Sequence, residues 1–330
     1  MADPILSVRD LRVELPIEGN WRPAVDGVSF DLRIGQSLGV VGETGCGKTL
    51  LARALVNLAP EEARVSGGVL CRGRDLFRLT EAEWTEVRGG EIALVFQEPA
   101  AALDPVQTIG AQIVEAIRPR RFGSSREARE VARGLLAEVS FPDPDRGLAE
   151  YPHRLSGGLK QRALIAIALA GNPAILIADE PTTALDATVS ADVLELLDRL
   201  RRERGLSLLL VTHDLASVAR HSDRTLVLYA GRVVEDAATS DLFRSPMHPY
   251  TRGLLECLPR IGVRGPSRLR AIPGTVPDLA FRPAGICAFA PRCGDQFSPC
   301  ELSEPALFPA GGGLARCFLY GPGAGSREGP

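Results

Sequence analysis

One eight-residue segment, residues 42–49 with the sequence GETGCGKT, most constrains the fold of this 330-residue chain. It fits the pattern G-x-x-x-x-G-K-[ST], follows the short apolar run Ser37–Val41 and leads into a helical pattern over residues 50–57. A loop of this kind turns backbone N–H groups towards phosphate oxygens, and the helix N-terminus adds partial positive charge. The segment therefore predicts a phosphate-binding loop (P-loop) in an α/β fold.

Each position of the P-loop has an expected role in nucleotide binding. The backbone cradles the phosphates, Lys48 reaches the β- and γ-phosphates, and the Thr49 hydroxyl ligates Mg²⁺. A glycine-rich turn with a chance lysine is the alternative, but Lys48 and Lys160 are the only lysines in the chain. The expected ATP-binding residues are Gly42, Glu43, Thr44, Gly45, Cys46, Gly47, Lys48 and Thr49.

The hydrophobic pattern around this loop predicts an α/β fold with a parallel sheet. Continuous apolar runs at residues 92–96, 174–178 and 206–211 are typical of central strands covered on both faces. Residues 6–15 and 28–34 alternate between apolar and polar and predict partly exposed strands. Amphipathic spacing predicts a helix over residues 189–203, and residues 98–160 are helical with proline and glycine breaks, which favours a helical subdomain.

Composition excludes some classes of function. The net charge of −3 gives no electrostatic reason to expect nucleic acid as a partner. We find no apolar run of the ~20 residues that a membrane-spanning helix needs. The first residues do not predict a signal peptide. If the protein acts at a membrane, other chains are expected to supply the spans.

A second motif places two carboxylates at the end of a buried strand, in residues 175–181 (ILIADEP). Ligand sites of α/β proteins lie at the carboxyl ends of the strands. We expect Asp179 to hold Mg²⁺ through water and Glu180 to act as the general base for the attacking water. The alternative is an acidic pair that is only solvated and has no catalytic role, and it is less favoured because a P-loop precedes the pair.

Residues 155–162 (LSGGLKQR) resemble the signature motif of ATP-binding cassette (ABC) ATPases. Ser156, Gly157 and Gly158 open a helix over residues 159–170, a second anion-binding N-terminus. The resemblance implies that this signature caps the γ-phosphate bound on a second ATPase subunit. It also implies an antiparallel β subdomain beside the helical one.

The same resemblance assigns further residues by their place in the chain. Gln97 resembles the glutamine that contacts Mg²⁺ and the water and couples to a membrane subunit. Asp186, in the segment 184–186 (ALD), resembles the acidic residue at the dimer seam, and His213 resembles the switch histidine near the γ-phosphate. Trp21 is the candidate platform for adenine, although a surface position is equally open.

The last part of the chain, residues 237–330, is rich in proline and is expected to form an extension to an ATPase domain spanning residues 1–236. Residues 247–252 (MHPYTR) and 272–277 (IPGTVP) resemble the extension of dipeptide, oligopeptide and nickel importer ATPases. Of the five cysteines in this region, the last four are separated by five, six and sixteen residues, wider than the two to four common within zinc-site pairs. Some relatives carry a [4Fe–4S] cluster here, so we expect a cluster, with zinc as the alternative, on Cys287, Cys293, Cys300 and Cys317. We also expect substitution of Cys293 to loosen the extension and spare ATP binding at Lys48.

The favoured hypothesis is the ATP-hydrolysing subunit of a peptide importer at the cytoplasmic face of the membrane. Its expected partners are two transmembrane permease subunits, a second and different ATPase subunit, and an extracytoplasmic solute-binding protein. Nickel or metal-chelate import is the alternative cargo. A soluble ABC protein without membrane partners is less favoured, because the chain has one cassette and no long coiled-coil insertion.

Overall fold

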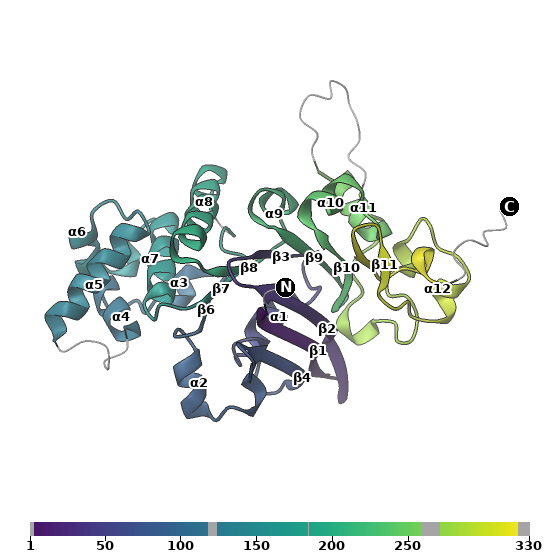
Figure 1. Cartoon of the computed structure of the whole chain (residues 1–330), viewed down its shortest axis with the longest axis horizontal. Coiled ribbons are helices and arrows are strands. Elements are labelled where there is room, and N and C mark those ends of the chain that lie inside the picture. The colour runs from purple at the N-terminus through teal and green to yellow at the C-terminus, as the bar shows by residue number, and fades with distance from the viewer. Residues whose placement is uncertain (1–2, 118–123, 184, 259–270, 323–330) are drawn as a thin grey trace, which may run out of the picture.

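The computed structural model describes residues 3–117, 124–183, 185–258 and 271–322. A central sheet runs across the molecule, with an antiparallel sheet against it (Figure 1). The helical subdomain lies at one end of the central sheet, and the C-terminal extension lies at the other. The predicted α/β class, with its antiparallel and helical subdomains, is confirmed.

Eight strands form the central sheet. In order across the sheet they are β11 (Phe308–Ala310), β12 (Gly313–Ala315), β10 (Arg232–Ala238), β9 (Arg224–Tyr229), β3 (Ser37–Val41), β8 (Ser207–Thr212), β7 (Ile175–Asp179) and β6 (Ile92–Val95). The strands from β9 to β6 are parallel, and β3, β7 and β8 are buried along their whole length. The predicted central strands are confirmed, each within one residue at its ends.

Helices pack on both faces of this sheet, because successive residues of its central strands are apolar and point to opposite faces. Leu209 and Val211 of β8 join the core cluster that contains α1 (Lys48–Ala54). Leu208 and Leu210 face the opposite cluster, which contains α7 (Gly157–Leu169) and α8 (Ala187–Arg204). Helix α9 (Leu215–His221) packs on β3 and β8. The continuous apolar runs read from the sequence therefore mark strands that are covered twice.

The antiparallel sheet has the strand order β2-β1-β4-β5. The second strand begins eight residues earlier than the predicted start at residue 28, because Pro23 and Gly27 interrupt the alternation that the prediction relied on. The third strand has no clear pattern, since it contains Gly67 and Gly68. The elements of this region are β1 (Pro4–Ile17), β2 (Asn20–Arg33), β4 (Arg64–Cys71), β5 (Arg74–Asp75), η1 (Leu76–Arg78) and α2 (Glu81–Val87).

The helical subdomain follows β6. Its helices begin at side-chain caps that the sequence supplies: Thr108 accepts a hydrogen bond from the Ala111 N–H, and Ser124 and Glu127 form a capping box. Its apolar faces pack together with α7 against the sheet. The elements are α3 (Pro99–Ala102), α4 (Ile109–Ala116), α5 (Ser125–Glu138), α6 (Pro144–Ala149) and η3 (Pro152–Arg154).

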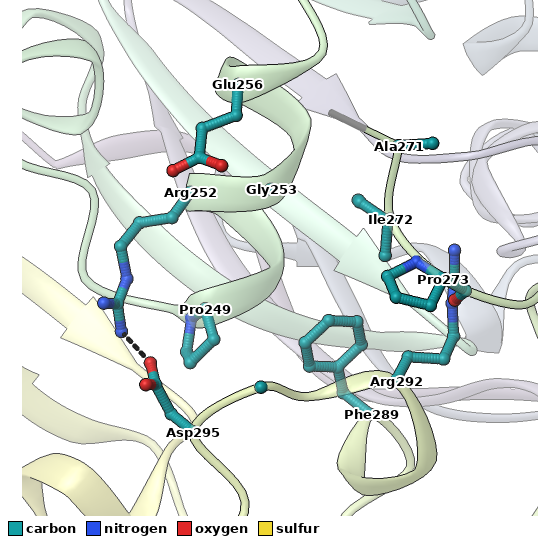
Figure 2. Close-up of a pocket in the computed structure, with 11 residues that line it drawn as sticks. Pro249, Arg252, Gly253, Glu256, Ala271, Ile272, Pro273, Phe289, Arg292 and Asp295 are labelled. Carbon is teal, nitrogen blue, oxygen red and sulfur yellow. Dashed lines mark hydrogen bonds and ion pairs between the residues drawn. The ribbon is translucent and has the colours of Figure 1, made fainter. Parts of the chain in front are cut away.

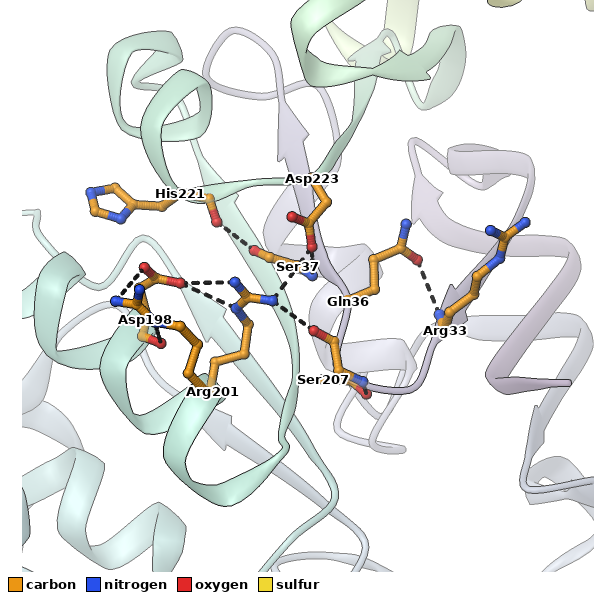
Figure 3. A network of polar contacts seen from close by, with 10 residues as sticks. Arg33, Gln36, Ser37, Asp198, Arg201, Ser207, His221 and Asp223 are labelled. Atoms are coloured by element: carbon orange, nitrogen blue, oxygen red, sulfur yellow. Dashed lines mark hydrogen bonds and ion pairs between the residues drawn. The ribbon is translucent and has the colours of Figure 1, made fainter. Parts of the chain in front are cut away.

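A polar network fixes the start of β3, the strand that leads into the P-loop (Figure 3). The Ser37 N–H donates to Asp223 at 2.8 Å, and the Ser37 hydroxyl donates to the carbonyl oxygen of His221 at 2.7 Å. Arg201, near the end of α8, donates to the carbonyl oxygen of Gly35 at 2.6 Å. These bonds satisfy partly buried backbone groups at the amino end of β3, the end opposite the P-loop.

The extension continues the central sheet instead of forming a separate core. Strand β12 pairs with β10, and Tyr229 of β9 packs against Tyr250 and Phe289 with ring centroids 4.7 and 5.2 Å away. Such a short loop-rich segment gains its buried apolar surface from the cassette. The remaining elements are α10 (Thr239–Arg244), α11 (Pro249–Glu256), η4 (Leu279–Phe281), η5 (Ala290–Arg292), α12 (Pro299–Leu302) and η6 (Phe318–Tyr320).

Candidate active site

The P-loop joins the end of β3 to the start of α1, as predicted. Gly47 has φ 105°, and a Cβ there would lie 2.6 Å from the carbonyl oxygen of Ala24, so a side chain does not fit. Lys48 is buried, and its ammonium donates to the carbonyl oxygens of Gly42 at 2.8 Å and Glu43 at 3.2 Å. The lysine therefore lies folded across the loop.

The tip of the loop and its floor differ in exposure. Thr44 and Gly45 are exposed, so their backbone can approach a ligand. Cys46 is fully buried, and burial raises the pKa of its thiol. Cys46 can thus contribute its backbone to a phosphate site while its side chain packs in the core.

Thr49 and Asp179 meet at the carboxyl end of the sheet. The Thr49 hydroxyl donates to the Asp179 carboxylate at 3.1 Å. Asp179 is 2% exposed, and burial raises the pKa of its carboxyl to about 6, with the neighbouring charge of Glu180 adding to the effect. A hydroxyl and a carboxylate side by side are the hard oxygen donors that Mg²⁺ prefers, so these two residues fit the predicted magnesium site.

Glu180 stands at the centre of the expected catalytic group. Its Oε2 accepts hydrogen bonds from Gln97 Nε2 at 3.0 Å and from the Thr183 hydroxyl at 2.9 Å, and His213 Nδ1 lies 3.3 Å away. Lys48 Nζ lies 3.9 Å from Oε1. The structure thus brings the predicted catalytic residues together with the P-loop lysine.

The backbone at Glu180 is also unusual. Its φ is 45°, in the left-handed region that residues other than glycine rarely adopt. The Glu180 N–H donates to the carbonyl oxygen of Val211 at 2.8 Å, which holds this turn against β8. The carboxylate is therefore aimed by its backbone as well as by its partners. Thr183, three residues on, was missed because a threonine in a loop gives no signal in the sequence.

The signature residues lie apart from this site in the same chain. Ser156 caps α7 by accepting a hydrogen bond from the Leu159 N–H at 3.4 Å. Ser156 and Gly157 are exposed, whereas a Cβ on Gly158 would lie 2.5 Å from Cγ1 of Val189 in α8. Figure 1 shows α7 on the side of the helical subdomain, away from α1. The described part of the chain thus contains an exposed helix N-terminus separate from the P-loop.

Two other predicted residues have local partners. The Asp186 carboxylate caps α8 by accepting a hydrogen bond from the Val189 N–H at 3.0 Å, while its neighbour Ala184 lies outside the described residues. Trp21 lies in β2, and the Arg64 guanidinium covers one face of its ring at 3.7 Å. An adenine ring would have to stack on the opposite face, so the role of Trp21 stays a prediction.

The extension supplies residues to the P-loop that sequence reasoning did not assign. The Tyr250 hydroxyl accepts a hydrogen bond from the Glu43 N–H at 2.9 Å, and Arg292 forms two hydrogen bonds with the Glu43 carboxylate. Arg282 donates to the carbonyl oxygen of Pro23 at 2.8 Å, beside the P-loop floor. Tyr250 lies within residues 247–252, which resemble the extension of importer ATPases, and Arg292 lies between the predicted ligands Cys287 and Cys293; these were the only available signals.

The four predicted ligand cysteines of the extension gather in one region. The Cys287 N–H donates to the carbonyl oxygen of Cys300 at 3.1 Å. Burial raises the pKa of Cys287, and it raises the pKa values of Cys293 and Cys317 to about 11, with the charges of the other cysteines adding to each effect. Nevertheless, no three His, Cys, Asp or Glu side chains among the described residues converge as ligands of one metal ion. The described residues therefore support neither the cluster nor the zinc ion, and both stay predictions.

Two family models match the chain. Residues 25–183 match the ABC transporter family, and residues 234–300 match the C-terminal region of oligopeptide/dipeptide transporters. A putative peptide import ATP-binding protein from Brucella abortus is 46% identical over 95% of this chain and 94% of its own. The dipeptide transport ATP-binding protein DppD from Bacillus subtilis is 43% identical over 92% of this chain and 90% of its own.

Solved structures agree with these matches. The ATP-binding cassette MJ0796, solved as a post-hydrolysis dimer with ADP and phosphate, superposes with a TM-score of 0.64 at 27% identity, over 71% of this chain and 98% of its own. Across the described ranges, none of the helices has the length and apolarity to span a membrane. With its P-loop, its acidic strand end and its extension, the chain belongs to the ABC transporter family, in the group of ATP-binding subunits with an oligopeptide/dipeptide transporter C-terminal region.

Proposed function

We propose that this chain hydrolyses ATP to energise the import of peptides through a membrane complex. The position of Glu180 is the observation that supports the ATPase activity. Its carboxylate accepts hydrogen bonds from Gln97 and Thr183, and His213 and Lys48 lie close to it. Peptide import is supported by the similarity to peptide import subunits over 95% of the chain, extension included. In this proposal residues 1–236 form the nucleotide-binding domain and residues 237–330 form the extension.

In this proposal each residue has a task in hydrolysis that its position supports. The loop backbone and Lys48 hold the phosphates, and on binding Lys48 exchanges the carbonyl oxygens of the loop for phosphate oxygens. Thr49 and Asp179 would hold Mg²⁺, which neutralises charge on the transferred phosphoryl group. The Glu180 carboxylate accepts the proton of the attacking water, and Gln97 and His213 orient that carboxylate.

A second ATPase subunit is part of the proposal. The exposed N-terminus of α7 at Ser156 lies apart from the P-loop of its own chain, and the related cassette MJ0796 was solved as a dimer. The signature of each subunit would close the nucleotide site of the other. In an assembled complex, Ser156→Arg should impair nucleotide trapping at the partner's P-loop and leave trapping at Lys48 intact. Loss at the Lys48 site alone would contradict the two-subunit site.

The remaining partners and the location follow from the proposed transport role. We place the chain at the cytoplasmic face of the membrane, on two permease subunits that are served by an extracytoplasmic solute-binding protein. The test is uptake by vesicles that contain the whole complex. ATP-dependent accumulation of a labelled peptide, absent with Lys48→Ala, supports peptide import. Accumulation of nickel but not of peptide would favour metal import. Uptake of neither, with ATP hydrolysis still active, would favour a non-transport ATPase.

We further propose that Cys287, Cys293, Cys300 and Cys317 hold a [4Fe–4S] cluster. A cluster spreads its four thiolates over four irons, so it does not require the close convergence that one metal ion requires. The mutual effect of these thiols on their pKa values supports a shared site. Anaerobically purified protein should be brown, with broad absorbance near ~400 nm and roughly four irons per chain. Colourless, iron-free protein would overturn the assignment.

A further inference from the structure

Arg292 of the extension binds the P-loop residue Glu43. Arg292 Nη1 lies 2.7 Å from Glu43 Oε2, and Arg292 Nη2 lies 3.0 Å from Glu43 Oε1, so the two side chains form a bidentate pair. The residues are 249 positions apart in the chain. Paired hydrogen bonds of this kind fix orientation as well as distance. The contact therefore ties a P-loop residue to a defined position in the extension.

Arg292 is itself held rigidly on the side of the extension. Its side chain is 5% exposed, and its Nε donates to the carbonyl oxygen of Pro273 at 2.7 Å. Its guanidinium carbon lies 5.7 Å from the ring centre of Tyr229 and 6.0 Å from that of Phe289. Figure 2 shows Arg292, Pro273 and Phe289 together on one side of a pocket of about 430 Å³. A long side chain with all of these contacts has little freedom left to lose.

On the side of the P-loop, Glu43 makes hydrogen bonds through its carboxylate, its backbone N–H and its carbonyl oxygen. Its carboxylate pairs with Arg292, its N–H donates to the Tyr250 hydroxyl, and its carbonyl oxygen accepts from Lys48 Nζ. The last bond connects the same residue to the lysine that receives the phosphates. The same carbonyl oxygen accepts a hydrogen bond from the Cys46 N–H at 3.2 Å, so two of the four partners, Arg292 and Tyr250, belong to the extension. The position of the P-loop backbone at residue 43 is thus set jointly by the P-loop and by the extension.

The arginine lies within the cysteine segment. Arg292 ends η5, between Cys287 and Cys293, and directly precedes Cys293 in the chain. The Arg292 and Cys293 N–H groups donate to the carbonyl oxygens of Phe289 and Ala290, so residues 289–293 form one tight turn. Any change that displaces Cys293 displaces Arg292 with it. Because Arg292 of this segment contacts Glu43 directly, a change in the conformation of residues 289–293 acts on the P-loop through a single contact.

We propose that Arg292 is a positioning residue for the P-loop, and that the conformation of residues 287–293 sets the affinity of the Lys48 site for ATP through the Arg292–Glu43 pair. The inference rests on the proposed nucleotide site and not on any cluster, because it requires only that the cysteine segment keeps its shape. It argues against our expectation that loosening the extension at Cys293 spares ATP binding at Lys48.

The first test is a mutant cycle on the full-length chain, with binding of a fluorescent ATP analogue plus Mg²⁺ as the readout. Arg292→Gln and Glu43→Gln should each weaken binding roughly 5- to 20-fold, within the range of coupling between sites. The double variant should lose no more affinity than the single variant that binds the analogue less tightly, because both substitutions break the same pair. Additive losses would overturn the proposal. In the assembled complex Arg292→Gln should raise KM for ATP and leave kcat within about twofold, because Glu180 is untouched.

A matched control is available in the same extension. Arg252 pairs with Asp295 at 3.0 Å on the other side of the pocket and has no contact with the P-loop among its described partners (Figure 2). Arg252→Gln removes a comparable charge and should leave affinity within about twofold. If Arg252→Gln weakens ATP binding as much as Arg292→Gln, the effect is general destabilisation and the specific role of Arg292 is overturned.

The second test addresses transmission from the cysteine segment. Cys293→Ser should weaken ATP binding in the wild-type background and have no further effect in the Arg292→Gln background. An equal effect in both backgrounds, or none in the wild type, would overturn the transmission step. Because the comparison is between backgrounds, it holds whether or not the protein carries iron, so it is separable from the cluster assignment.

A measurement on the unmodified chain avoids any question of folding. Coupling between sites is reciprocal, so ATP binding must order the segment that favours it. Amide hydrogen exchange of residues 287–293 should slow when ATP and Mg²⁺ are added, and the change should disappear in Arg292→Gln. Unchanged exchange in this segment of the wild-type chain, while the P-loop itself becomes protected, would overturn the proposal.

Discussion

Gln97 Nε2 donates a hydrogen bond to Glu180 Oε2 across 3.0 Å, and this bond joins the ends of the two neighbouring strands β6 and β7. Gln97 begins the connection into the helical subdomain, whereas Glu180 is the expected base for the attacking water. Movement of the helical subdomain therefore changes the orientation of the carboxylate. The catalytic carboxylate and the glutamine that is expected to couple to a membrane subunit share one hydrogen bond.

Replacement of Glu180 by Gln separates hydrolysis from binding. The amide cannot accept the proton of water, so hydrolysis should slow by about 10²- to 10⁴-fold, the range typical for general bases. Binding of ATP should stay within about threefold of wild type, because the P-loop and Lys48 are unchanged. Lys48→Ala is the contrasting variant and should weaken binding itself. The measurement is single-turnover hydrolysis beside equilibrium binding; wild-type turnover with Glu180→Gln would require another base.

Asp179→Asn should stabilise the protein without metal. Burial raises the pKa of Asp179 from 3.8 to about 6, so the folded state favours the protonated acid and stability falls as pH rises through this window. Above pH 6 the buried charge costs up to about 3 kcal/mol, at 1.36 kcal/mol per unit. Without Mg²⁺, Asp179→Asn should therefore melt at a higher temperature than wild type at pH 7.5 and at a similar temperature at pH 4.

The same carboxylate is needed for the metal, which gives this prediction its control. Mg²⁺ with ATP should raise the melting temperature of wild type at pH 7.5, and the increase should shrink below pH 6 as Asp179 becomes protonated. Asp179→Asn should show little dependence on Mg²⁺ at either pH. A lower melting temperature for Asp179→Asn at pH 7.5 without metal would contradict the cost assigned to the buried charge.

The P-loop, the acidic pair and the signature were found from sequence because each lies within about eight consecutive residues. A strand followed by a glycine-rich loop and a helix is a local arrangement, so its residue types appear together in the chain. The same holds for β7 and β8, whose unbroken apolar runs report burial directly. His213 and Gln97 needed the family pattern, since a single polar residue after a strand is ambiguous.

Contacts between distant segments gave no such signal. Glu43 and Arg292 lie 249 positions apart, and neither residue type in its local sequence indicates a partner. The pairing of β12 with β10 is similar, because three-residue strands have no measurable periodicity. The attachment of the extension to the P-loop depends in the same way on tertiary packing. Such non-local pairs are the part of the site that only the structure supplies.

His248 gives a prediction about acid stability. Its ring Nδ1 accepts a hydrogen bond from the Tyr250 N–H at 3.0 Å and caps α11, and burial lowers the pKa of the ring to about 3. Because the folded pKa lies below 6.5, the contribution to stability is complete above pH 6.5 and is lost as pH falls towards 3. At pH 5 the loss is about 2 kcal/mol, at 1.36 kcal/mol per unit.

The variant His248→Asn isolates this effect. Asparagine is a good helix cap but does not titrate. The free energy of unfolding of His248→Asn should therefore fall less between pH 7 and pH 5 than that of wild type. Denaturant unfolding at the two pH values measures the difference. The comparison removes the contribution of Glu235, a buried carboxylate that accepts the Met247 and His248 N–H groups and is common to both proteins. Equal pH dependence in the two proteins would show that His248 is not the titrating group.

The thiols of the extension should be slow to react when no metal is bound. Burial raises the pKa values of Cys293 and Cys317 to about 11, against 9.0 for an ordinary thiol. Two units leave about 100-fold less thiolate, and the thiolate is the reactive form. Alkylation of the metal-free chain at pH 7.5, followed by mass spectrometry of peptides, should therefore be about 100-fold slower at these two positions than in the same chain unfolded in denaturant.

The raised pKa values also determine how a cluster or metal could bind. Each thiol that becomes a ligand must release its proton, so apparent affinity should rise with pH and binding should release close to one proton per ligating cysteine. Proton release measured during anaerobic reconstitution with iron and sulfide, in weakly buffered solution, tests this once the protons released by hydrosulfide as it becomes bridging sulfide are subtracted. Cys293→Ser removes one ligand and should lower the number released. Rapid alkylation of Cys293 in the folded metal-free chain would instead mean that the thiol is already ionised, and the burial that raises its pKa would not describe the protein in solution.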